Sequence, residues 1–135
     1  MRAIKESLGK GRSRAVYGLS GAGQSLFIAG IVAGSGLPAI VIVPDDDAAF
    51  RLQADLRHIL GGEVFLFLPW DFFVDKTAGN AFIPRQRLAS LEALVRGRGV
   101  VIATAPALLR ALIPPQNFSE ACRVIEKESS LEPDE

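Results

Sequence analysis

Residues 14–43 read RAVYGLSGAGQSLFIAGIVAGSGLPAIVIV and contain segments of clearly different character. Arg14–Tyr17 has the composition of a short strand, and Gly18–Ser25 is rich in glycine. Gly23–Ala33 is apolar nearly all round, which predicts a buried helix. Ala39–Val43 is a continuous apolar run, typical of a central parallel strand covered on both faces. Strand, glycine loop, helix and strand in this order begin an α/β fold.

The alternation of strands and helices continues along the chain. Strands are predicted at Val64–Leu68 and Val100–Ala103, and helices at about 45–60, 84–96 and 106–112. Two helices carry apolar stripes that should face the core, namely Ala49, Leu52, Leu56 and Ile59, and Leu88, Leu91, Leu94 and Val95. The pattern predicts a three-layer α/β fold with a mainly parallel sheet of about four strands.

Composition limits the classes of function. Fifteen basic and fifteen acidic residues cancel, so the whole chain has no strong basic field for nucleic acid. The single cysteine (Cys122) and single histidine (His58) exclude a disulfide framework and two-histidine zinc motifs. Asp45–Asp47 could bind a metal, but consecutive carboxylates before a helix more often cap it, so no metal site is expected. The charge-free residues 15–44 are broken by glycines, which favours a cytoplasmic protein over a membrane one.

Charge distribution suggests how the chain is organised. Residues 1–14 form a basic amino-terminal segment, residues 15–113 form the α/β domain, and the acidic residues 114–135 begin a next domain or form a disordered tail. The basic segment leaves open a DNA-binding module, although the balanced charge of the rest speaks against it.

The glycine-rich segment is the most specific motif. Gly18–Ser25 matches the P-loop pattern G-x-x-x-x-G-K-[ST] at every fixed position except Gln24, which replaces the lysine. That lysine contacts the β- and γ-phosphates, and glutamine carries no charge. The interpretation favoured is a vestigial phosphate loop without cofactor or catalytic residue, formed by Gly18, Gly21, Gly23, Gln24 and Ser25. A weak anion or nucleotide site and a working nucleotide-hydrolysing site are the alternatives.

Two further groups are candidates for binding a partner. Trp70, Asp71, Phe72 and Phe73 follow a predicted strand, at the end where open α/β sheets bind ligands. They either form an interface, where aromatic residues are enriched, or plug the core. Arg85 and Arg87 stand at a helix start, where positive charge opposes the helix dipole. They indicate a carboxylate or phosphate partner, a solvated surface, or an internal pair with Asp71 or Asp75.

Several segments occur in an order that resembles a known family. They are Tyr17–Phe27 (YGLSGAGQSLF), the strand followed by Pro44-Asp45, Leu68–Asp71 (LPWD), Arg85–Leu88 (RQRL), and the stretch from Ala107–Leu109 to Ile113–Pro115. Together they resemble the amino-terminal region of the bacterial transcription-repair coupling factor, which is similar to the first domain of UvrB. The resemblance covers about Ala15 to Phe118 and implies a RecA-like fold of the UvrB domain 1a type.

Two departures from UvrB favour the coupling factor. UvrB has lysine where this chain has Gln24. Only eleven residues separate Phe73 from Arg85, too few for the long β-hairpin with which UvrB clamps DNA.

The resemblance also implies a function. It implies a non-catalytic module of a transcription-coupled DNA repair factor, which takes part in recruiting UvrA and in restraining a downstream motor. In that family the whole protein is an ATP-dependent DNA translocase. Its DNA-binding motor, its RNA polymerase contact and most of its UvrA contact are expected beyond this chain. The alternative is an active P-loop enzyme, such as a UvrB-like helicase or a kinase.

Overall fold

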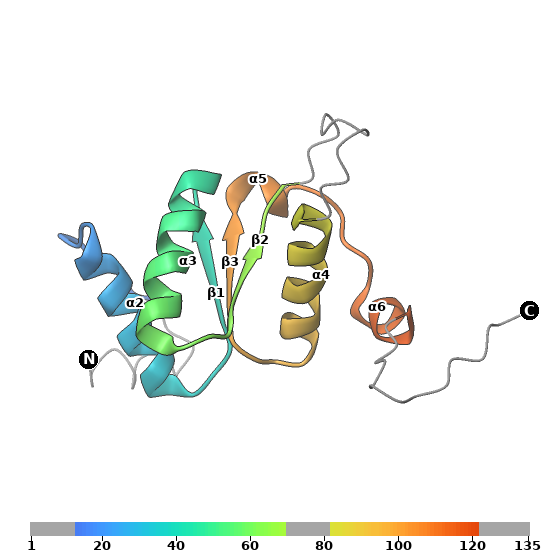
Figure 1. Ribbon diagram of the computed structural model, residues 1–135, viewed down its shortest axis with the longest axis horizontal. Helices are drawn as coiled ribbons and strands as arrows, with labels where there is room; N and C mark the ends of the chain where they lie inside the picture. Colours follow the sequence, from blue (N-terminus) through green and yellow to red (C-terminus); the bar gives the residue numbers. More distant parts are fainter. Residues whose placement is uncertain (1–12, 70–81, 122–135) are drawn as a thin grey trace, which may run out of the picture.

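The computed structural model describes residues 13–69 and 82–121, which form an α/β unit of three layers (Figure 1). Helices α2 and α3 cover one face of a parallel sheet, and α4 and α5 cover the other. The predicted α/β architecture with a parallel sheet is confirmed. The elements follow one another as α2 (Ala22–Ser35), β1 (Ala39–Val43), α3 (Asp46–Leu60), β2 (Val64–Phe67), α4 (Phe82–Val95), β3 (Val100–Thr104), α5 (Ala105–Leu108) and α6 (Pro115–Ala121).

The sheet of the described residues has three strands in the order β1-β3-β2, all parallel. All five residues of β3 are buried, because this strand has a neighbour on each side and helices on both faces. The fourth strand predicted at Arg14–Tyr17 is wrong, since these residues are exposed and belong to no strand. Only residues 18–21 separate this segment from α2. Helix α2 packs mainly along α3, so this short connection does not place the segment beside a strand of the sheet.

Within residues 13–69 and 82–121, strand β1 lies at an edge of the sheet, whereas the sequence predicts a central strand. Ala39, Val41 and Val43 pack toward the core beneath α3, whereas Ile40 and Ile42 are more than half exposed. Helix α4 covers β2 and β3 but leaves this side of β1 open. A uniformly apolar strand does not reveal which of its two faces is covered.

Helix α3 begins and ends as its sequence predicts. The Asp45 carboxylate accepts a hydrogen bond from the Ala48 N–H at 2.8 Å and caps the first turn. Gly61 ends the helix with φ of 78°, a left-handed conformation that glycine adopts easily. The predicted stripe is correct for Ala49, Leu52 and Leu56, but Ile59 is exposed and Gln53 is buried in its place.

The buried faces of α2 and α4 differ from prediction. In α2 only Ser25 and Ala29 are buried, because the helix packs mainly against one neighbour, α3, rather than on all sides. In α4, Leu91 and Leu94 pack against the core as predicted. Leu88 and Val95 are exposed, while the buried positions are Arg87, Ser90 and Ala93.

The chain after β3 is less helical than predicted. The helix expected at 106–112 is the single turn of α5, and α6 follows with Phe118 buried. Residues 13–69 and 82–121 contain no helix both long and apolar enough to span a bilayer.

Candidate functional site

The glycine loop does not have the geometry of an open phosphate cradle. Such a cradle points its backbone N–H groups at the anion. Here the Gly23 N–H donates to the Ser20 carbonyl at 3.1 Å, and the Gln24 N–H donates to the Gly21 carbonyl at 3.0 Å. Two of the N–H donors that would hold a phosphate are therefore bonded within the loop. The loop is largely exposed, and the segment before it is irregular rather than a strand.

Ser25 stands where a P-loop has its magnesium ligand, but it is engaged elsewhere. Its side chain is buried, and its Oγ donates to Oδ2 of Asp55 in α3 at 2.5 Å. No sequence pattern predicts this contact, because Asp55 lies off the apolar stripe of α3 and 30 positions from Ser25. The bond joins the first turn of α2 to the middle of α3.

Arg87 lies at the carboxyl end of the sheet and is almost fully buried. Its guanidinium lies over the Phe67 ring, 4.0 Å from the centroid, and its Nη1 donates to the Leu68 carbonyl. Burial lowers the pKa of Arg87, and the positive charge of Arg110 lowers it further. Arginine remains protonated at neutral pH despite such a shift, so a cation is enclosed here.

The structure separates Arg85 from Arg87, which the sequence grouped together. Arg85 is exposed on the first turns of α4, whereas Arg87 points into the core. The two arginines therefore do not form one surface site. Their predicted partners Asp71 and Asp75 lie outside the described residues, as do Trp70, Phe72 and Phe73.

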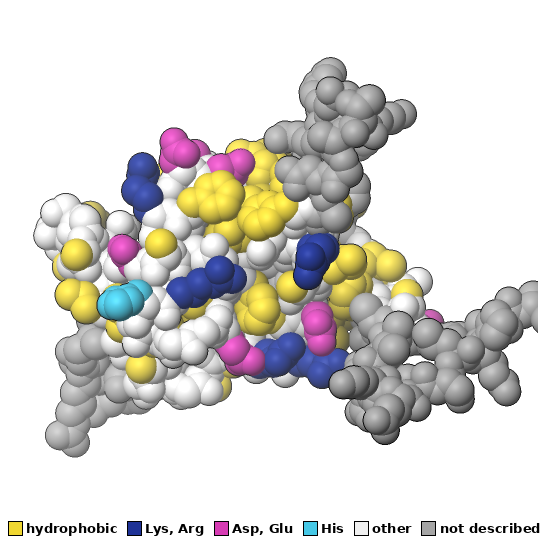
Figure 2. Space-filling model, in the orientation of Figure 1, with side chains coloured by type: hydrophobic (Ala, Val, Ile, Leu, Met, Phe, Trp, Pro, Cys, Tyr) yellow, Lys and Arg dark blue, Asp and Glu magenta, His cyan; other side chains and the backbone are white. Residues whose placement is uncertain are grey.

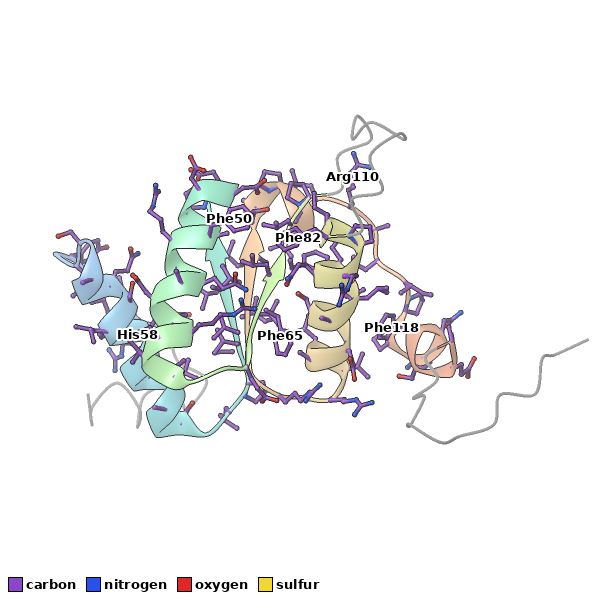
Figure 3. The ribbon with its side chains drawn as sticks, viewed as in Figure 1. Phe50, His58, Phe65, Phe82, Arg110 and Phe118 are labelled. Carbon is purple, nitrogen blue, oxygen red and sulfur yellow. The ribbon has the colours of Figure 1, made fainter. Side chains whose placement is uncertain are left out.

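Exposed aromatic side chains mark the same end of the sheet. Phe50 of α3 is 43% exposed and Phe82 of α4 is 44% exposed; both lie near the carboxyl ends of the strands (Figure 3). Hydrophobic side chains gather on the surface between these helices (Figure 2). Sequence reasoning missed Phe50, whose only signal is its place one residue beyond the buried Ala49.

Of the three consecutive aspartates, Asp45 caps α3 and the other two belong to its first turn. Asp45 accepts the Ala48 N–H, and Asp46 and Asp47 fall in the first turn. Across residues 13–69 and 82–121, no three His, Cys, Asp or Glu side chains are grouped so as to hold a metal ion. His58 is exposed on α3 (Figure 3).

Comparison with known proteins gives one consistent relationship. No family model matches the chain. The chain is similar to UvrABC system protein B of Ralstonia nicotianae, with 26% identity over 89% of this chain and 20% of the relative. It is also similar to UvrABC system protein B of Carboxydothermus hydrogenoformans, with 25% identity over 94% of this chain and 22% of the relative. The protein of the same name from Photobacterium profundum is 26% identical over 76% of this chain and 18% of the relative. The chain thus spans about a fifth of the length of these relatives.

Proposed function

We propose that this chain is a non-catalytic module of a bacterial nucleotide excision repair protein, akin to the amino-terminal region of the transcription-repair coupling factor. In this proposal it takes part in recruiting UvrA and in restraining a motor elsewhere in the longer protein. Similarity to UvrABC system protein B over most of the chain supports the repair role. Gln24 and the short connection between Phe73 and Arg85 favour the coupling factor over UvrB.

The non-catalytic assignment rests on the glycine loop Gly18–Ser25, whose backbone amides are bonded within the loop. Gln24 supplies no charge for a transferring phosphate, and the Gly23 and Gln24 amides are bonded inside the loop. The Ser25 hydroxyl donates to Asp55 instead of facing a metal ion. A working P-loop needs its lysine, its backbone amides and its hydroxyl together. Here the lysine is replaced by Gln24, and the amides and the hydroxyl are hydrogen-bonded to other groups of the chain.

Calorimetric titration with Mg-ATP tests this assignment. We expect no micromolar affinity for the natural chain, and none after Gln24→Lys, because the added lysine does not free the bonded amides. Gln116→Lys adds the same charge on α6 and controls for nonspecific attraction. Micromolar binding by the natural chain would refute the non-catalytic assignment. Binding gained only by Gln24→Lys would show that the cradle is intact and lacks only its lysine.

Capture of purified UvrA tests the proposed partner. We expect weak or no capture by this chain alone and strong capture by the whole amino-terminal region of a coupling factor. No capture by either would contradict the proposed recruitment role. Strong capture by this chain would place the interface within it, and the exposed Phe50 would then be the first side chain to replace.

A further inference from the structure

Ser25 is the point at which the glycine loop is attached to the rest of the fold. Every residue from 13 to 24 is exposed, whereas the Ser25 side chain is buried, with the residue 4% exposed. Its hydroxyl donates to Oδ2 of Asp55, in the middle of α3, at 2.5 Å. A buried hydroxyl that loses its acceptor costs free energy, so this bond determines where the first turn of α2 lies.

The amides that could hold a phosphate are next to this attachment. The Gly23 and Gln24 N–H groups donate to carbonyls within the loop. The N-cap residue of α2, Gly21, has no side chain with which to cap the helix. Turning both amides toward an anion would break their bonds and rotate the turn that carries Ser25. The hydrogen bond to Asp55 opposes this rotation.

We propose that Asp55 keeps the glycine loop closed, with its amides bonded within the loop, and thereby prevents the loop from binding a phosphate. This inference rests on the proposed non-catalytic function and extends it. Gln24 accounts for the missing positive charge, and Asp55 accounts for the missing cradle of free amides. Because Asp55 acts through Ser25, it is a positioning residue. Without it, the amides become free to bind an anion such as the phosphates of a nucleotide.

The hydrogen bond of Asp55, rather than its charge, carries this role. Asp55 as a whole is exposed, so water and salt screen its charge. Asparagine keeps a side-chain oxygen that can accept the Ser25 hydroxyl, whereas alanine offers no acceptor. Asp55→Asn and Asp55→Ala therefore separate loss of the charge from loss of the hydrogen bond.

Amide hydrogen exchange followed by NMR tests whether Asp55 closes the loop. We expect Asp55→Ala to speed the exchange of the Gly23 and Gln24 amides by about tenfold to a hundredfold, which corresponds to loss of a hydrogen bond to a charged group. Asp55→Asn is expected to retain most of the protection. Ser25→Ala breaks the same bond without leaving a buried hydroxyl, and it is expected to act like Asp55→Ala.

The matched control for exchange is Asp47→Ala. It removes an exposed carboxylate about two turns earlier in α3, and the two amides are expected to exchange as in the natural chain. Unchanged exchange in both alanine variants that break the bond overturns the proposal, and so does equal acceleration by Asp47→Ala. Equal acceleration of the amides within α3 would show a general loss of stability and would also contradict it.

Calorimetric titration with Mg-ATP tests the consequence for phosphate binding. We expect detectable binding by the Gln24→Lys/Asp55→Ala protein, and none by Gln24→Lys alone or by Gln24→Lys/Asp47→Ala. If neither the first double variant nor the natural chain binds, the role of Asp55 is overturned while the non-catalytic function stands. Binding by the natural chain would refute that function instead. Binding by Gln24→Lys alone would overturn the role of Asp55, because the loop would open with Asp55 in place.

Discussion

Gly99 occupies a position that no other residue fits. Its φ is +68°, and a Cβ there would lie 2.6 Å from the Glu63 carbonyl oxygen. Its own carbonyl accepts the Ala39 N–H, so this residue stands where the beginnings of all three strands meet.

We therefore expect Gly99→Ala to destabilise the chain strongly. The left-handed conformation costs about 1–2 kcal/mol for alanine, and the backbone clash brings the expected loss to about 3 kcal/mol. Gly97→Ala is the control: φ is +60° but no atom lies within 4 Å of its Cβ, so only about 1 kcal/mol is expected. Urea unfolding measures both, and equal losses would show that the clash relaxes away.

At the same scale, the sequence predicted residue types better than residue roles. Asp45 was identified correctly as a cap, because a cap depends on neighbours in sequence. For Arg87 the sequence left open a surface position, a bound partner or an internal pair with Asp71 or Asp75, whereas its side chain stacks on Phe67 and donates to the Leu68 carbonyl. Its surroundings come from another element, 19 positions away, and no local pattern contains them.

Among the elements, strand β2 has backbone carbonyls that accept hydrogen bonds from polar helix side chains. A pattern of hydrophobic residues does not predict which polar side chains these are. Gln53, Arg87 and Ser90 interrupt the apolar stripes of their helices, so the sequence assigned the wrong faces to parts of α3 and α4. Their burial is explained by the outward carbonyls of β2, which need donors once a helix covers them.

Ser90→Ala tests the contribution of these hydrogen bonds. The serine Oγ lies 2.6 Å from the Leu66 carbonyl, and its loss leaves a buried acceptor without that donor. We expect the free energy of unfolding to fall by about 1–3 kcal/mol. Ser119→Ala removes a similar bond to the Pro115 carbonyl on exposed α6, and a change within about 0.5 kcal/mol is expected. Thermal or urea unfolding compares them, and a Ser90→Ala protein as stable as the Ser119→Ala protein would contradict this contribution.

For the whole molecule, the alternation of strands and helices was enough to predict the layers and the parallel sheet. It did not predict the order β1-β3-β2 or the position of α2. Strand order depends on which apolar runs become neighbours, and Ala39–Val43 and Val100–Thr104 are both apolar enough for the centre. The position of α2 depends on contacts with α3 such as Ser25 to Asp55, which appear only in three dimensions.

The strand order predicts what happens when β3 is removed. A chain ending at Arg98 keeps β1 and β2, but these strands are not neighbours and each loses its hydrogen-bonded partner. We expect this shortened chain to show no cooperative unfolding transition by circular dichroism, whereas the full chain shows one. A cooperative transition in the shortened chain would mean that β1 and β2 can pair directly.

The central place of β3 also affects how the chain is made. Ala39 pairs with Val100, so a ribosome that has finished β1 must add about sixty more residues before its partner begins. At roughly 5–20 residues per second, this takes about 3–12 s. Throughout that interval the apolar β1 segment is synthesised but lacks β3, the strand with which it pairs. The speed of translation from residue 44 to residue 100 therefore sets how long the nascent chain is exposed to aggregation and to chaperones.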